Sequence, residues 1–287
     1  MRESGFLHKS RIFSFFCPGD FCFPPNYGIM EQRPESGGYP MEQIYTIPVN
    51  EAFEKVRDEQ HMCPFCLLYN RLESGELDLI LGASAMEPDV RIKTNELGFC
   101  DTHFGMMFKR SKRLPLALMM ESLLNEGVAK DLEGNMGMFI QKTGEAVAKK
   151  LEKRACSCYV CQRIENNFIH MLETAAILWQ SDSAFHEKAK AAPYFCVPHY
   201  GRFIRVAKDR LSKKDFAEFF AAMNEIETKY LEELRGDVSW FCKKFDYRYE
   251  NEPWGNAKDA PERARLFLTG SLHAEEEGVK KPSDGLT

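Results

Sequence analysis

The chain has 287 residues, which suits one large domain or two modest ones, because single hydrophobic cores stop growing at roughly 250 to 300 residues. Its composition, 44% hydrophobic and 28% charged, excludes a chain disordered throughout and a collagen-like repeat. The 38 basic and 43 acidic residues give a net charge of −5, which disfavours general nucleic-acid binding because that affinity depends on clustered cations.

No apolar run approaches the roughly 18 residues needed to span a bilayer, so we predict no membrane span. The basic start of the chain leads to Cys17, but its apolar stretch is too short for a signal peptide. We therefore expect a cytoplasmic protein. In a reducing compartment, regular spacing among the ten cysteines favours metal binding or catalysis over a disulfide framework.

Residues 1–40 are rich in Pro and Gly without any sustained period, and we interpret them as a disordered or mis-annotated leader. If the leader is mis-annotated, we expect translation to begin at Met41 or Met30; otherwise it begins at Met1. The segment QIYTIPV that follows Met41 predicts a short extended stretch, with Asn50 as the N-cap of the next turn.

Apolar spacing predicts helices over residues 65–80, 114–131, 138–155 and 163–180. A longer helix begins after Ser212, a good N-cap, and its apolar stripe continues to Tyr249, a rod of about 55 Å. One stripe of that length needs several shorter helices to cover it, so we predict an all-α helical bundle. We divide the chain into a helical domain (41–250), with repeats at about 60–135 and 155–250, a docking segment (251–267) anchored by Trp254 and Phe267, and a disordered tail (268–287).

An internal duplication of metal-ligand spacing is the most informative feature. In each copy a CxxC pair is followed, after 33 or 34 intervening residues, by a CxxH pair. Three thiolates and one imidazole are a ligand set of closed tetrahedral zinc sites. We therefore predict two zinc ions per chain, each pinning one of the two repeats. The ligands are Cys63, Cys66, Cys100 and His103 in the first copy, and Cys158, Cys161, Cys196 and His199 in the second.

Four protein ligands leave no position open for water, which favours structural over catalytic zinc. Loss of one ligand is then expected to unfold its half of the chain. Iron–sulfur clusters usually take four cysteines, and each quartet here contains a histidine. A redox-active CxxC is the sharper rival, but it requires strands around the motif and leaves the CxxH pairs without a purpose.

Other candidates carry weaker signals. We interpret Cys156 as a bystander, Cys242 as a core thiol and His170 as a solvated residue without a partner. The basic segment at residues 109–113 could contact phosphate but is more simply a solvated loop. The aromatic-rich segment at residues 240–254 is core by its helical spacing, with a surplus that could form an interaction groove or a base-stacking surface.

Several longer segments carry a family resemblance: IYTIPVNEAF, CPFCLLYNRLE, GASAMEPDVR, GFCDTHF, SCYVCQRIEN, FCVPHYG and WFCKKFDYRY. Over about residues 41–266 the chain resembles an uncharacterised domain-of-unknown-function family found mainly in Clostridia and related gut Firmicutes. Members often carry an automated "ABC transporter substrate-binding protein" name, which neither an export signal nor a two-lobed α/β pattern supports here. The resemblance implies that the family's paired CxxC and CxxH motifs map onto the eight residues named above. It implies no activity.

The sequence contains no glycine-rich phosphate loop, no GxSxG elbow and no HExxH motif, so we assign no catalytic and no cofactor-binding residue. We predict a zinc-binding structural or interaction protein with a protein partner of unknown identity. The first alternative is a thiol/zinc redox sensor or oxidoreductase, in which cysteines release zinc on oxidation. The second is a regulator that contacts nucleic acid.

Overall fold

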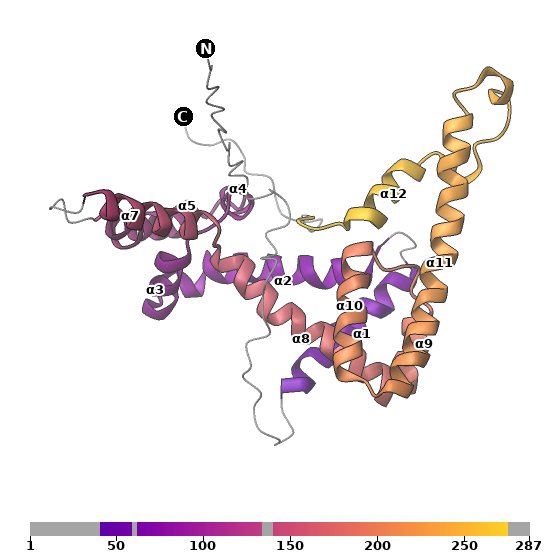
Figure 1. Ribbon diagram of the computed structural model, residues 1–287, viewed down its shortest axis with the longest axis horizontal. Coiled ribbons are helices and arrows are strands. Elements are labelled where there is room, and N and C mark those ends of the chain that lie inside the picture. Colours follow the sequence, from indigo (N-terminus) through magenta and orange to yellow (C-terminus); the bar gives the residue numbers. More distant parts are fainter. Residues whose placement is uncertain (1–40, 59–61, 134–139, 275–287) are drawn as a thin grey trace, which may run out of the picture.

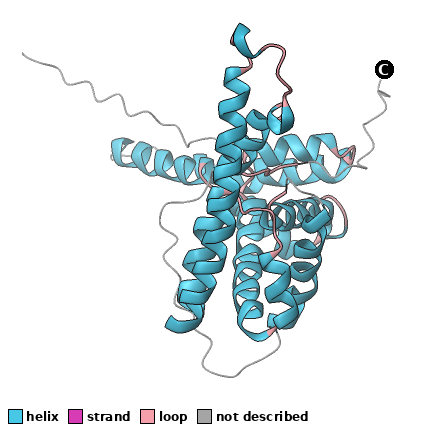
Figure 2. Ribbon diagram, turned by 90° about the vertical axis from the view of Figure 1, so that its right-hand side faces the viewer, coloured by secondary structure: helices cyan, strands magenta, loops and turns pink. Residues whose placement is uncertain are grey.

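The computed structural model describes residues 41–58, 62–133 and 140–274. Within these ranges the chain is built of helices joined by short loops and contains no strand (Figure 2), which confirms the predicted all-α class. No helix in the described ranges is both long enough and apolar enough to cross a membrane. The predicted leader and the last residues of the predicted tail lie outside the described part.

The segment predicted to be extended forms helix α1 (Met41–Asp58) instead. Val49, Ala52, Phe53 and Val56 recur at helical spacing, and all four are fully buried. Their burial outweighs the backbone hydrogen bond lost at Pro48 inside the helix. The predicted N-cap role of Asn50 is therefore also wrong, since its side chain donates to the Thr46 carbonyl within the helix at 3.1 Å.

Helices α2 (Pro64–Ile80) and α8 (Tyr159–Ser181) cross the middle of the molecule in opposite directions (Figure 1). The Tyr69 and Phe168 rings meet at a centroid distance of 5.7 Å, while Glu76, further along α2, binds Arg163, nearer the start of α8, at 3.2 Å. Helix α8 thus begins beside the later part of α2, and α2 begins beside the middle of α8. Helices α1 and α10 (Val197–Arg210) pack against α8, and α1 also packs against α2.

The remaining elements are short, apart from α7 and α11. Residues predicted as one helix at 114–131 form a continuous run of α5, the π-helical turn η2 and α6, and the helix predicted at 138–155 is α7. The bounds are η1 Ala83–Met86, α3 Pro88–Leu97, α4 Asp101–Lys109, α5 Arg113–Ser122, η2 Leu123–Val128, α6 Ala129–Leu132, α7 Ile140–Ala155, α9 Ser183–Lys190, η3 Tyr247–Tyr249, η4 Gly255–Ala257 and α12 Ala260–Thr269.

Helix α11 (Lys213–Lys243) begins at the predicted N-cap, where the Ser212 hydroxyl accepts the Asp215 N–H at 3.2 Å. It ends before Tyr249 because the chain turns back and the Lys244 ammonium donates to backbone carbonyls of that turn. Of the aromatic-rich segment, Trp254 packs on Phe241, whereas the Phe245 and Tyr247 side chains point largely into solvent. Helix α12 docks through Phe267, whose ring meets that of Tyr194 edge to face and that of Tyr230 at a tilt.

A cluster of fully buried phenylalanines ties the central helices together. Phe65 at the start of α2 lies at the middle of it, with ring centroids at 5.6 Å from Phe53, 5.7 Å from Phe195 and 4.7 Å from Phe203. Edge-to-face contacts of this kind stabilise the core beyond simple burial. The cluster fixes α1, α2 and α10 at the point where α2 begins.

We predict that Phe65→Ala lowers the free energy of unfolding by about 3–5 kcal/mol, because it leaves a large cavity in this cluster. The exposed Phe245 provides the matched control, and Phe245→Ala is expected to change the free energy by no more than about 0.5 kcal/mol. Urea unfolding followed by circular dichroism measures both. Equal losses in the two variants would contradict the placement of Phe65.

Candidate metal centres

All four cysteine motifs occupy the same position, the first turn of a helix. The first residue of each motif is an N-cap in extended conformation, and its carbonyl accepts the first hydrogen bond of the helix. The fourth residue follows one turn later on the same face. Partial positive charge at helix N-termini favours thiolates over thiols. The four N-caps are Cys63 for α2, Cys100 for α4, Cys158 for α8 and Cys196 for α10.

The structure groups the eight predicted residues into two clusters, but not within the two copies. Site A combines the first CxxC with the second CxxH, and site B combines the second CxxC with the first CxxH. The prediction that each copy holds its own quartet is therefore wrong. Site A consists of Cys63, Cys66, Cys196 and His199, and site B consists of Cys100, His103, Cys158 and Cys161.

The exchange of partners follows from the opposed directions of α2 and α8. The chain leaves α2 near the start of α8, so the CxxH motif that follows α2 meets Cys158 and Cys161. After α8, helix α9 and the loop that follows it bring Phe195 against Phe65 at the start of α2, so the second CxxH motif meets Cys63 and Cys66. Site B meets α2 at Glu73, which lies about 10 Å along the helix from Cys66, so the first CxxH motif is too far from Cys63 and Cys66 to share one ion with them.

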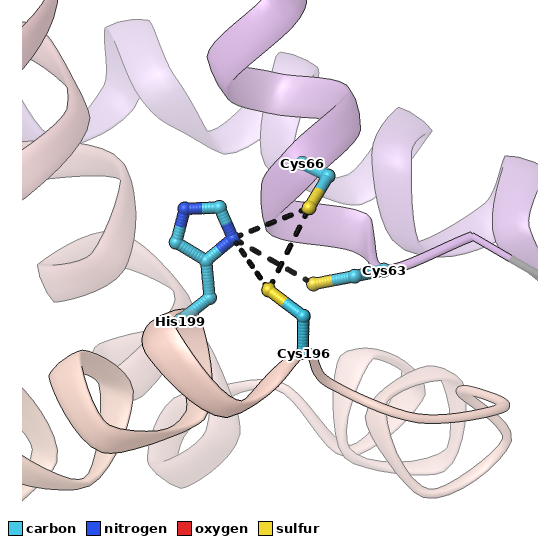
Figure 3. Close-up of side chains that lie close together, drawn as sticks. All are labelled: Cys63, Cys66, Cys196 and His199. Atoms are coloured by element: carbon cyan, nitrogen blue, oxygen red, sulfur yellow. Dashed lines mark hydrogen bonds between the residues drawn. The ribbon is translucent and has the colours of Figure 1, made fainter. Parts of the chain in front are cut away.

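Site A is closed around the Nδ1 atom of His199 (Figure 3). This nitrogen lies 3.8 Å from the Cys63 sulfur, 3.5 Å from that of Cys66 and 3.2 Å from that of Cys196. The Cys66 and Cys196 sulfurs are 3.6 Å apart, far beyond the roughly 2.05 Å of a disulfide bond. All four residues are buried.

Site B has the same form around the Nδ1 atom of His103. The Cys100, Cys158 and Cys161 sulfurs lie at 3.1, 3.3 and 3.4 Å from this nitrogen. The Cys100 and Cys161 sulfurs are 3.9 Å apart. His103 is fully buried and Cys158 nearly so, whereas Cys100 and Cys161 are partly exposed.

These distances fit a tetrahedral metal ion at each site. Zinc binds sulfur at about 2.3 Å and nitrogen at about 2.0–2.1 Å, which places tetrahedral ligand sulfurs roughly 3.8 Å apart and sulfur and nitrogen roughly 3.6 Å apart. The observed sulfur–sulfur distances are 3.6 and 3.9 Å. The sulfur–nitrogen distances run from 3.1 to 3.8 Å. The donor atoms could therefore share one metal ion at each site without moving far.

Protons hold each cluster together when no metal is bound. At site A, hydrogen bonds from the Cys196 and Cys63 thiols lower the pKa of Cys66 to about 4, while burial raises the pKa of Cys63. At site B, the hydrogen bond with Cys158 contributes most to lowering the pKa of Cys100 far below its usual range. One thiolate is thus favoured in each cluster. A divalent cation must displace the remaining thiol protons, so metal affinity decreases as the pH falls.

A buried carboxylate supports site B from outside. Glu73, on α2, accepts a hydrogen bond from His103 Nε2–H at 3.0 Å and another from His273 Nδ1–H at 2.6 Å. Although burial opposes it, hydrogen bonds with Cys100, Cys158 and Glu73 raise the pKa of His103 to about 11. With its Nε2 proton held by Glu73, the imidazole keeps Nδ1 directed at the sulfurs. Carboxylates that accept from a ligating histidine tighten metal sites in this way.

The chain after α12 covers site A. Asn70 holds the Ser271 carbonyl at 2.8 Å, and the Ser271 N–H donates to the Cys66 sulfur at 3.3 Å. Gly270 adopts a positive φ of 79°, and a Cβ atom there would lie 3.2 Å from the Cys196 sulfur and 3.3 Å from that of Cys66. Glycine is therefore required both by the backbone conformation and by the close approach to the sulfurs.

Helix α11 positions the CxxH motif of site A through Glu227. This buried carboxyl group accepts the Phe195 N–H at 2.6 Å, directly before Cys196. Burial raises the pKa of Glu227 to about 8, so the group is mainly protonated at neutral pH. The sequence reasoning missed Glu73, Glu227 and His273. Only Glu73 carries a signal, since it lies seven residues after Cys66 on a helix whose start bears a metal motif.

The remaining candidates do not join either cluster. Cys156 and Cys242 are exposed, so the prediction of Cys242 as a core thiol is wrong. His170 has a partner after all, since its Nδ1 lies 3.1 Å from Glu173. In the basic segment at residues 109–113, Arg110 binds Asp78 at 2.6 Å. Residues 268–274, predicted as part of a disordered tail, include the end of α12 and the cover of site A.

Comparison with known proteins places the chain in a family. A family described as a family of unknown function (DUF6062) matches residues 41–275, which include all eight clustered residues together with Glu73, Glu227 and His273. No curated protein and no solved structure matches the chain.

We predict that Glu227→Ala lowers the free energy of unfolding by about 1–3 kcal/mol, because the buried Phe195 N–H loses its acceptor. Glu227→Gln keeps an acceptor and should match the stability of the wild type at about pH 4, where the wild-type carboxyl group is protonated in the folded chain. The folded pKa of about 8 lies above the unfolded value of 4.5, so wild-type stability from this group decreases as the pH rises between them. Urea unfolding at several pH values should show that the free energy of unfolding of Glu227→Gln rises relative to that of the wild type across this range. A parallel pH dependence in both proteins would contradict the assignment.

Proposed function

The chain belongs to this family of unknown function, DUF6062, and we propose that it is a protein whose helical fold is held by two structural zinc ions. The observation that carries the proposal is the pair of clusters, each with three cysteine sulfurs and one histidine nitrogen within 4.8 Å of one another. Clusters of this composition suit zinc better than iron–sulfur, which usually takes four cysteines.

A structural role suits these donor sets better than a catalytic one. Four protein ligands complete the tetrahedron, so no position is open for a water molecule or a substrate. Structural zinc in small domains contributes apparent binding free energies of about 10–16 kcal/mol near neutral pH. That is as large as the net stability of a typical domain, so the fold would depend on the metal.

Because the motifs pair between the two copies, each ion would link the two halves of the chain instead of stabilising one repeat alone. Site A joins the start of α2 to the start of α10, and site B joins the start of α4 to the start of α8. Loss of either ion would therefore loosen both halves. A rigid surface of this kind suits a cytoplasmic interaction protein, and we propose a protein partner.

The charge distribution around the basic segment argues against nucleic acid as that partner. Arg110 and Lys112 both approach the Asp78 carboxylate, and Arg113 lies over the Phe108 ring at 5.3 Å. Cations engaged in this way offer less to phosphate groups, and the chain as a whole is acidic.

Zinc stoichiometry of paired variants tests both the metal and the grouping. In the double variant Cys63→Ser/Cys196→Ser both substitutions fall in site A, so we expect one zinc ion per chain by elemental analysis. In Cys63→Ser/Cys100→Ser the substitutions fall in different sites, so we expect almost none. The wild type should bind two.

Two outcomes would count against the proposal. A wild-type protein that contains no zinc after purification, and takes up none when zinc is supplied, would contradict the proposed metal function. The reverse pattern, with one ion left in Cys63→Ser/Cys100→Ser, would show that each CxxC pairs within its own copy.

We predict that Glu73→Ala weakens zinc binding at site B by about 10- to 100-fold, because His103 loses the acceptor that orients its ring. Glu73→Gln, which keeps an acceptor oxygen without the charge, should lose less. Competition with a chromophoric chelator, with site A as the internal reference, measures the change. Equal weakening of both sites would indicate general destabilisation instead.

A further inference from the structure

The two sites differ in their access to solvent. At site A the three cysteines are each no more than 1% exposed. At site B, Cys158 is 6% exposed, and Cys100 and Cys161 are partly open. Small oxidants react with cysteine sulfur where it is both ionised and accessible. The chemistry available to the two clusters is therefore different, although their ligand sets are the same.

The cover of site A contributes to this difference at Cys66 and Cys196. Gly270 lies against the Cys66 and Cys196 sulfurs, and the Ser271 N–H donates to Cys66. An N–H donor withdraws charge from a thiolate and makes it less nucleophilic. At site B the same stretch of chain supplies only His273, which contacts Glu73 and lies outside the ring of sulfur ligands.

We propose that site B is a reversible oxidation site, at which peroxide converts Cys100 and Cys161 into a disulfide and releases the metal ion, while site A keeps its own. This inference rests on the proposed zinc function. The two sulfurs are 3.9 Å apart, so side-chain rotations that bring each about 1 Å closer reach the bonding distance of roughly 2.05 Å.

The reaction balances with hydrogen peroxide as the oxidant. One of the two thiolates attacks a peroxide oxygen, the O–O bond breaks, and a sulfenic acid and hydroxide form. The second thiolate then attacks the sulfenic sulfur and expels a second hydroxide. Two thiolates lose two electrons in total, and the peroxide gains them. Cys158 and His103 remain, and two donors do not retain zinc against a chelator.

Oxidation of the zinc-loaded full-length protein with hydrogen peroxide tests this assignment. Peroxide is added in the presence of a chromophoric zinc indicator, and the disulfides are located by peptide mass spectrometry. We expect about one zinc ion released per chain, a Cys100–Cys161 disulfide, and recovery of both the thiols and the second zinc ion after a thiol reductant and zinc are supplied.

A glycine variant tests the role of the cover. Gly270→Ala places a methyl group against both site A sulfurs at a positive φ, so the cover must shift, and peroxide should then release close to two zinc ions. Gly255→Ala is the matched control. It imposes a positive φ of 56° with no atom within 4 Å of the added Cβ, and its release should stay near one ion. Zinc content and circular dichroism before oxidation show whether each variant is folded.

The wild-type result alone decides the inference. Release of both ions together, release from site A first, or a disulfide that joins Cys156 instead of the Cys100–Cys161 pair would overturn it. A protein that contains no zinc before oxidation would instead overturn the proposed function. The two failures are therefore distinguishable.

Discussion

Three sulfurs and one imidazole nitrogen surround a common point at each site, and the convergence of these four donors is the constraint on which the rest of the structure depends. Thiolates withdrawn from water repel one another, and the metal-free chain can keep them together only by protonating most of them. A divalent ion at each site would replace those protons with four bonds to protein ligands. Because every motif begins a helix, each of these bonds would also fix the direction in which that helix leaves the site.

The antiparallel packing of α2 and α8 decides which motifs meet. Each helix starts at one site and passes close to the other, as the contacts of Phe168 with His199 and of Glu73 with His103 indicate. The phenylalanine cluster around Phe65 sets this crossing, and it lies directly beside site A. Site A and the hydrophobic core are therefore packed together as one structure.

The sequence predicts the helical class, the long helix after Ser212 and all eight clustered residues, because these depend on local spacing. It does not predict their grouping, since the two CxxC motifs offer the same donors as each other, and so do the two CxxH motifs. Only the tertiary path of α2 and α8 distinguishes the two pairings. The same holds for Glu73 and His273, which lie 200 residues apart and meet only in the folded chain. At Pro48, local propensity predicts a break in the helix, and the burial of Val49 and Phe53 overrides it.

NMR of the protein loaded with the magnetically active isotope of cadmium, a spectroscopic substitute for zinc, tests the central claim most directly. Scalar couplings identify which cysteine protons share each metal ion. The account predicts two cadmium signals, one coupled to Cys63, Cys66 and Cys196, and the other coupled to Cys100, Cys158 and Cys161. A signal coupled to Cys63, Cys66 and Cys100 together, or a chain that binds no cadmium, would contradict it.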